Sequence, residues 1–295
     1  MATRSSVAGS VGADGSETPR YLLDETSVCL GELDRLEWTD VMTVELDGLH
    51  VGVRSSSPEL QDLLGEAMAA HVVDDDRTPP NYSLLLGNGH RSRAKGFHFL
   101  YRSSNVHLRT RDPRRVVTGL VSHLSSLRTS RFDGLVALHG CGLVGTTGAA
   151  VAPLSLRPLR SQIERRLNLR GVRFVDLPWV FLDPGRMEMV VPEPTITVEA
   201  SVLDRIDELA PSRRADPPVP PGRYPLTSWI FFGQAERPLS RGQALAAAAH
   251  DAFTGDPTSH QATIDALADV MRRIKPVTLD WSEPVKLVDP LVELV

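Results

Sequence analysis

Residues 132–184 combine short apolar runs and turn signals in an order that strongly constrains the fold. They read FDGLVALHGCGLVGTTGAAVAPLSLRPLRSQIERRLNLRGVRFVDLPWVFLDP. The pattern predicts a strand over 135–140, a turn at Gly145–Gly148 and a strand over 149–152, followed by a loop, a helix and another strand. Strands that alternate with a helix in this way are typical of α/β proteins.

The loop before this helix has an unusual composition. Residues 153–161 read PLSLRPLRS, with two prolines and no glycine. Loops that cradle phosphates are rich in glycine, because glycine tolerates the required backbone angles and lets the ligand approach the N–H groups. We therefore predict an ordered turn and helix start that fills the place of a phosphate cradle.

Two interpretations of the basic residues in this loop remain open. Arg157 and Arg160 are either ordinary charged side chains at a helix start, or they bind an anion together with Ser161 and the helix N-terminus. In the first case a nearby acidic residue, such as Glu164 one turn further on, neutralises the arginines.

The chain is expected to hold a small N-terminal α/β region over 21–130 and a second domain over 131–295, after a disordered tail at 1–20. The tail is polar and lacks the apolar core of a signal peptide. The elements expected in the first region are a hairpin around Asp47-Gly48, a helix from Ser57-Pro58, strands at 82–86, 97–101 and 105–110, and a helix at 113–127.

Three further segments carry expectations that the structure can test. Asp74, Asp75 and Asp76 indicate a solvated loop, with metal binding as the alternative. Six prolines in 211–225 indicate a crossing loop or flap, followed by a compact strand at 229–233. The cluster from Asp204 to Glu208 indicates a surface helix.

Composition limits the classes of function. The net charge of −5 provides no basic field for nucleic acid, and no apolar run is long enough to cross a membrane. The two cysteines, Cys29 and Cys141, form no CxxC pair, so a reducing cytoplasm is expected. The only lysines are Lys95, Lys275 and Lys286, all outside the loop.

From about residue 41 to the end, the chain resembles the HPr kinase/phosphorylase-related proteins. It is most similar to the stand-alone, PqqD-associated members of the peptide-tailoring type. The resemblance is carried by LHGCGLV at 138–144, by FVDLPWVFLDPGRMEMVVPEP at 174–194, and by the C-terminal order of two helices, a strand and a last helix. It implies a P-loop-kinase-like C-terminal domain.

The resemblance also implies positions for the functional residues of that family. Counting back from Gly171 places Arg160 at the P-loop lysine and Ser161 at the magnesium-binding Ser/Thr. The loop glycines fall on Leu154, Arg157 and Leu159, and the acidic pair falls on Leu177 and Pro178. His139 is retained, and Asp176 lies one residue before the acidic pair.

His139 and Asp176 are therefore the candidate catalytic residues. A histidine at the end of a buried strand serves equally well as a hydrogen-bond donor in the core. On a regular strand Asp176 would point to the opposite face from its neighbour. A register slip would restore one carboxylate but not a pair.

These losses predict a catalytically degenerate protein, a pseudokinase that binds a peptide or protein partner within a biosynthetic pathway. No cofactor is expected. The first alternative is an active ATP-dependent kinase for a Ser/Thr or a small molecule, which would use ATP and Mg²⁺ through Arg160 and Ser161. The second alternative is a structural subunit whose cleft is an interface in a homo-oligomer.

Overall fold

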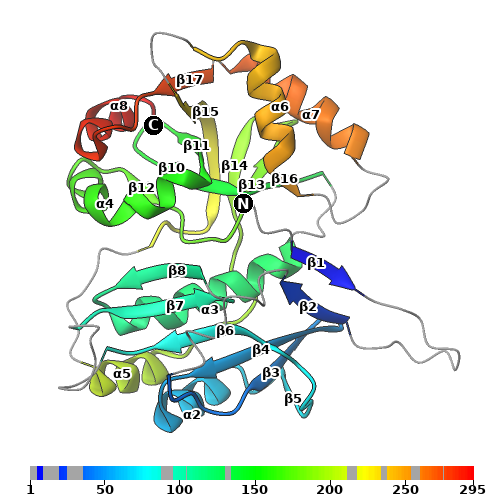
Figure 1. Ribbon diagram of the computed structural model, residues 1–295, viewed down its shortest axis with the longest axis vertical. Coiled ribbons are helices and arrows are strands. Elements are labelled where there is room, and N and C mark those ends of the chain that lie inside the picture. Colours follow the sequence, from blue (N-terminus) through cyan, green and yellow to red (C-terminus); the bar gives the residue numbers. More distant parts are fainter. Residues whose placement is uncertain are drawn as a thin grey trace, which may run out of the picture. The chain divides into compact units, whose positions relative to one another are not determined.

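The computed structural model shows an α/β protein, as the sequence predicts (Figure 1). It describes residues 5–8, 20–24, 36–87, 96–103, 105–129, 134–210, 218–233, 238–253, 260–274 and 276–295. The chain divides into two compact units. Unit 1 comprises Met1–Leu124 and Thr195–Ala215, and unit 2 comprises Ser125–Pro194 and Asp216–Val295.

Unit 1 contains one eight-stranded mixed sheet and its helices. The path of the sheet is β1-β2-β4-β6-β7-β8, and β3 pairs with both β4 and β5. The elements are β1 (Ser5–Ala8), β2 (Arg20–Asp24), β3 (Met42–Leu46), β4 (Leu49–Ser55), α2 (Pro58–Ala67), β5 (Val72–Val73), β6 (Pro80–Leu85), β7 (His98–Arg102), β8 (Asn105–Thr110), α3 (Pro113–Thr129) and α5 (Ala200–Leu209).

Local sequence signals explain the first hairpin and helix. Asp47 and Gly48 both adopt positive φ angles, 52° and 73°, as a two-residue turn between right-twisted strands requires. The Ser57 side chain accepts a hydrogen bond from the Leu60 N–H and so caps α2, with Pro58 in the first turn. Both predictions are confirmed.

The N-terminal segment departs from the expected disordered tail over 1–20. Residues 5–8 form β1, which pairs antiparallel with β2, and β2 in turn runs parallel to β4. The ladder satisfies backbone N–H and C=O groups of both strands, and composition alone does not predict such pairing. The other residues before Arg20 lie outside the described part of the chain.

The domain boundary differs from the predicted one because α5 belongs to unit 1. Residues 195–215 were expected in the second domain. Val202 and Ile206 of the helix are buried, and ion pairs also connect it to the first-unit helices α3 and α2. Arg114 lies 2.8 Å from Asp204 and 2.5 Å from Asp207, and Arg205 lies 2.6 Å from Glu66. The division between the units falls within α3, after Leu124 rather than after residue 130.

The Asp74–Asp76 loop is only partly solvated. The Asp75 side chain is 12% exposed, and its Oδ2 lies 2.6 Å from His50 Nδ1. It also accepts hydrogen bonds from the Arg77 N–H and the Thr78 hydroxyl. The bond to His50 is the main reason why the pKa of Asp75 falls from 3.8 to about 2.

Unit 2 is built on a nine-stranded mixed sheet with the path β12-β10-β11-β15-β14-β13-β9-β16, and β17 pairs with β15. The elements are β9 (Val136–Leu138), β10 (Gly140–Val144), β11 (Ala149–Pro153), the 3₁₀ helix η2 (Leu154–Leu159), α4 (Arg160–Leu169), β12 (Arg173–Phe174), β13 (Val180–Asp183), β14 (Glu188–Val191), β15 (Gly222–Phe232), α6 (Arg241–Asp251), β16 (Ala252–Phe253), α7 (His260–Arg273), β17 (Pro276–Leu279), the 3₁₀ helix η4 (Pro284–Leu287) and α8 (Val288–Glu293).

The direction of the strands places α4 in an α/β crossover. β11 runs parallel to β15, and β15 runs parallel to β17. β10 runs antiparallel to both β11 and β12. The strands before and after α4 therefore point the same way, with β10 between them, and α4 makes the connection.

The predicted strand over 135–140 is interrupted at His139. β9 pairs with β13 and β16, whereas β10 pairs with β11 and β12. The bend at His139 carries the chain from one set of strands to the other, and its N–H donates to the Asp251 carbonyl at 2.7 Å.

β15 is longer than the predicted strand at 229–233. It begins at Gly222, inside the Pro-rich segment, and residues 222–225 pair with β14. The prediction of a loop is therefore wrong for residues 222–225, while residues 218–221 precede the strand and residues 211–217 lie outside the described residues. Pro225 has no N–H, and it stands where the ladder changes from β14 to β11.

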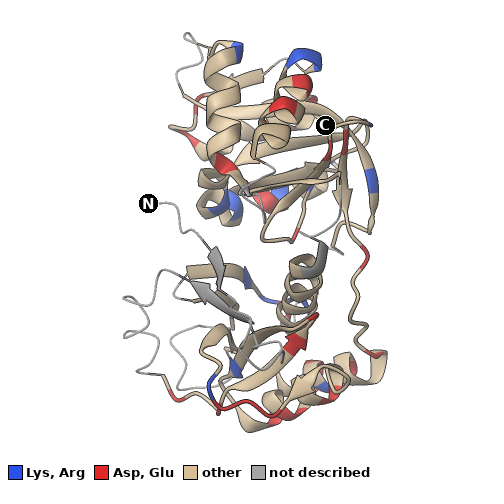
Figure 2. Cartoon of the chain, turned by 90° about the vertical axis from the view of Figure 1, so that its right-hand side faces the viewer, with Lys and Arg blue, Asp and Glu red and all other residues tan. Residues whose placement is uncertain are grey.

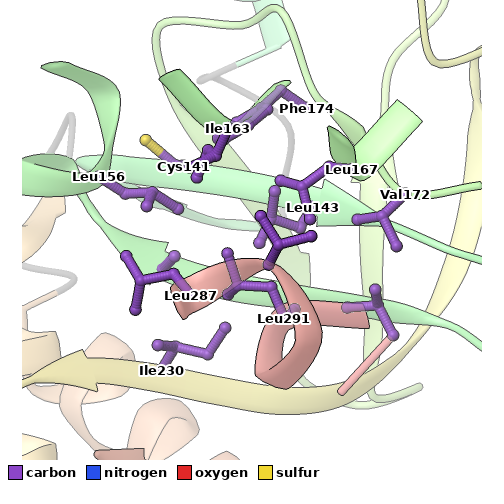
Figure 3. Close-up of a cluster of buried hydrophobic side chains, with 14 residues drawn as sticks. Cys141, Leu143, Leu156, Ile163, Leu167, Val172, Phe174, Ile230, Leu287 and Leu291 are labelled. Atoms are coloured by element: carbon purple, nitrogen blue, oxygen red, sulfur yellow. The ribbon is translucent and has the colours of Figure 1, made fainter. Parts of the chain in front are cut away.

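The core beside α4 joins the start of the unit to its C-terminal helices (Figure 3). Its buried side chains come from β10, β11, η2, α4, β12, β15, η4 and α8. Those labelled in Figure 3 are Cys141, Leu143, Leu156, Ile163, Leu167, Val172, Phe174, Ile230, Leu287 and Leu291.

The close packing of the β10–β11 turn against Val295 generates a stability prediction. A Cβ atom on Gly145 would lie 2.7 Å from both Cγ2 and the carbonyl oxygen of Val295, which is 3% exposed. We expect Gly145→Ala to lower the free energy of unfolding by about 1–3 kcal/mol in urea titrations. Gly242→Ala is the control, because nothing lies within 4 Å of the added carbon. An equal loss in both variants would contradict this packing.

The Asp75 contacts predict a pH dependence of stability. A carboxyl group whose pKa is lowered on folding stabilises the protein above its unfolded pKa, and this contribution is lost as the pH falls through the folded value. Asp75→Asn should therefore be less stable than wild type at neutral pH, and the difference should narrow between pH 3.8 and about 2. Urea unfolding at a series of pH values measures it, with the exposed Asp76→Asn as control. A difference that does not change with pH would argue against a lowered pKa of Asp75 in the folded protein.

Candidate functional site

The loop that the sequence singles out forms a compact helical connection. Residues 154–159 wind into η2 directly after β11, and α4 begins at Arg160. Leu156 is fully buried in the core beside Ile163 and Leu167. The prediction of an ordered turn and helix start is confirmed. Because the 3₁₀ helix uses its backbone groups internally and Pro158 has no N–H, η2 does not have the open backbone of a phosphate cradle.

Arg160, the first residue of α4, is held between two carboxylates. Its Nη2 lies 2.6 Å from Glu164 Oε1, one turn along α4, and 2.5 Å from Asp176 Oδ1. The three side chains are 14%, 22% and 12% exposed, in the order Arg160, Glu164, Asp176. Its guanidinium carbon also lies 4.9 Å from the ring centre of Phe174 in β12.

The pKa of Arg160 reflects a competition between burial and charge pairing. Desolvation by burial disfavours the charged form, and the charges of Asp176 and Glu164 favour it more strongly. The net result is a pKa raised above the ordinary value, so the guanidinium stays charged. Two carboxylates face one guanidinium here, and together they would repel an additional anion.

Arg157 is the other arginine of the loop, and it bonds within the unit. Its Nη2 donates to the Leu177 carbonyl at 3.3 Å. Burial raises the pKa of the neighbouring Cys141 thiol, while the charges of Arg157 and Arg160 partly oppose that rise. The thiol is therefore held in its neutral form inside the core, as a small apolar side chain would be.

The remaining candidates occupy different environments. Ser161 is exposed on α4, and His139 is half-buried at the bend between β9 and β10. Leu177 and Pro178, where the resemblance expects an acidic pair, are both buried.

The structure thus brings together Arg160 and Asp176, which were proposed for different roles. Asp176 was considered as a displaced acid of a catalytic pair. Arg160 was considered either as a charge neutralised by Glu164 or as a cation for an anion or nucleotide. Glu164 completes the cluster and was recognised from its spacing of four residues. The contact with Asp176 crosses from α4 to the segment after β12, and spacing along the sequence does not reveal such contacts.

No protein family, curated protein or solved structure matches this chain. Within the described ranges, no helix is both long enough and apolar enough to cross a lipid bilayer. In the same residues, no group of three His, Cys, Asp or Glu side chains is arranged to hold a metal ion.

A double-mutant cycle tests the Arg160–Asp176 ion pair. Arg160→Met removes the guanidinium that faces the buried Asp176 carboxylate, and should lower the free energy of unfolding by about 3 kcal/mol. Asp176→Ala should cost less, because Arg160 keeps its contact with Glu164. The double variant should lose clearly less than the sum of the two, because both members of the Arg160–Asp176 contact are then absent and only the more exposed Glu164 carboxylate remains. The exposed Arg166→Ala on the same helix is the control and should stay within about 0.5 kcal/mol of wild type. Additive losses in the cycle would mean that the pair does not form.

Proposed function

We propose that this chain is a catalytically degenerate HPr-kinase-like protein, a pseudokinase that acts as a binding or regulatory partner in a peptide or natural-product biosynthetic pathway. The observation that carries the proposal is the pairing of Arg160 with Glu164 and Asp176. The resemblance assigns Arg160 to the position of the phosphate-binding lysine. In this chain that cation is already neutralised by the protein's own carboxylates.

The geometry of the neighbouring residues supports the same proposal. Phosphoryl transfer requires positioned phosphates, a magnesium ion and a group that accepts the proton of the nucleophile. The wound η2 segment does not provide the backbone nest, and buried apolar residues occupy the positions of the acidic pair. Asp176 carries a carboxylate nearby, but it is engaged with Arg160.

The alternative of an active kinase requires a specific rearrangement. Nucleotide binding at the loop would have to release Arg160 from both carboxylates and unwind η2, which would expose Leu156 from the core. Losing two charge-assisted contacts and the burial of a leucine together costs several kcal/mol. A nucleotide would have to supply this energy in addition to its own binding free energy.

The proposed partner is a peptide or a protein from the same pathway, and the proposed location is the cytoplasm. The buried free thiol of Cys141 is consistent with a reducing compartment. No resident cofactor is proposed, and ATP with Mg²⁺ would be needed only by the active-kinase alternative. The possibility that the protein is a structural subunit of a homo-oligomer is tested by the same experiments.

We expect no saturable binding of ATP in the presence of Mg²⁺ when the full chain is titrated in a calorimeter. We also expect no transfer of the γ-phosphate to casein or to a mixture of Ser/Thr peptides. Arg160→Ala and the surface control Arg166→Ala should behave like wild type in both assays.

Saturable ATP binding with transfer, abolished by Arg160→Ala and retained in Arg166→Ala, would overturn the proposal in favour of an active kinase. Sedimentation of the same samples measures their oligomeric state and so tests the structural-subunit alternative. A stable oligomer without nucleotide binding would favour the structural-subunit alternative.

A further inference from the structure

The outer face of β7 and β8 in unit 1 carries a row of aromatic rings beside two arginines. Phe99 pairs across the ladder with Arg109, and Tyr101 pairs with Val106. Leu100 and Leu108 point to the opposite face, where a Cβ atom on Gly119 of α3 would lie 3.7 Å and 3.1 Å from their methyl groups. Because side chains alternate along a strand, Phe99 and Arg109 face away from α3.

The two arginines of this face are held by aromatic rings. The guanidinium carbon of Arg109 lies 4.0 Å from the ring centre of Phe97 and 6.0 Å from that of Phe99. That of Arg111 lies 4.7 Å from Phe97. Stacking of this kind orders the guanidinium groups without neutralising them.

Arg109 and Arg111 contrast with the arginines described above. Both are exposed, and among the described residues neither forms an ion pair with a carboxylate. Arg114, Arg160 and Arg205 each have acidic partners within 2.8 Å. Two ordered positive charges without a carboxylate partner in the described part of the chain make this face complementary to an acidic ligand.

β8 also offers a backbone edge. It is the last strand on its side of the sheet, and in the part of the chain that the structure describes it pairs only with β7. Val106, on the same face as the arginines, is 47% exposed. An edge strand presents N–H and C=O groups to which an extended peptide can add as a further strand.

We propose that the β8 edge binds an acidic peptide segment in an extended conformation. Arg109 and Arg111 are two residues apart and share one face, so carboxylates two residues apart on an added strand would lie opposite them. The preferred motif is therefore Glu or Asp, any residue, then Glu or Asp. This inference rests on the proposed function only in taking a peptide as the partner, and it does not involve the α4 site.

A single-stranded nucleic acid is the competing ligand for a face of aromatic rings and arginines. Bases bind such faces by stacking on open rings. Here Phe97 is covered by two guanidinium groups, and Phe99 stacks on Tyr101 with ring centres 5.8 Å apart. Acidic and basic residues are also interspersed over both units in the view of Figure 2. These observations favour the peptide.

The test measures fluorescence anisotropy of a short, fluorescein-labelled peptide of alternating Glu and Val against the full chain without nucleotide. Saturable binding is expected, weakened at least about tenfold in Arg109→Ala/Arg111→Ala, because each exposed charge-assisted bond contributes modestly. Arg109→Lys/Arg111→Lys should bind with intermediate affinity. The control Arg165→Ala/Arg166→Ala removes the same charge from the exposed face of α4 and should bind as wild type does.

Two modified peptides separate strand addition from simple charge attraction. One peptide is N-methylated at every Glu residue and the other at every Val residue. The two modifications block opposite edges of the extended peptide. Strand addition predicts that only one of the two peptides loses binding.

Four results would overturn the proposal: no binding of the Glu-Val peptide, equal binding of a Gln-Val peptide, equal effects of both methylated peptides, or tighter binding of a labelled oligouridylate. None of them depends on ATP, so failure here is distinguishable from failure of the proposed function.

Discussion

A buried positive charge is the constraint on which the architecture around α4 depends. Arg160 is 14% exposed, and a guanidinium so far removed from water requires local compensation. Glu164 supplies it from the same helix, Asp176 supplies it from the segment after β12, and the Phe174 ring lies against the same group. The Arg160 side chain therefore connects the start of α4 to β12 and to the segment after β12. Its positive charge makes the ion pairs on which this connection depends.

The two units differ in the arginines that they present to a ligand. In unit 2 the arginines of the loop bond to the protein itself, and the loop is wound into η2 with Leu156 in the core. In unit 1 Arg109 and Arg111 are ordered by aromatic rings and exposed, beside a strand edge. The two surfaces support the proposals that the protein binds a partner through its first unit and does not transfer phosphate in its second.

Local features of the sequence predicted local structure well, and contacts through space were missed. The Asp47-Gly48 turn, the Ser57 cap of α2 and the strand–helix order around α4 depend on neighbouring residues and were recognised. Arg114 contacts α5 from about ninety positions away along the chain, and the Arg160–Asp176 pair joins a helix to a later segment. Pro225, which has no N–H, lies in β15 where the pairing partner changes from β14 to β11. The strand can therefore run through the end of a Pro-rich segment.

The central claim is that Arg160 is neutralised by its own chain and unavailable to phosphate. The most direct measurement is the Nε–Hε NMR signal of Arg160, assigned by its loss in Arg160→Lys, during a titration with ATP and Mg²⁺. The account predicts a signal whose position does not change up to millimolar nucleotide. A saturable shift of this signal, together with release of Glu164 and Asp176, would contradict it.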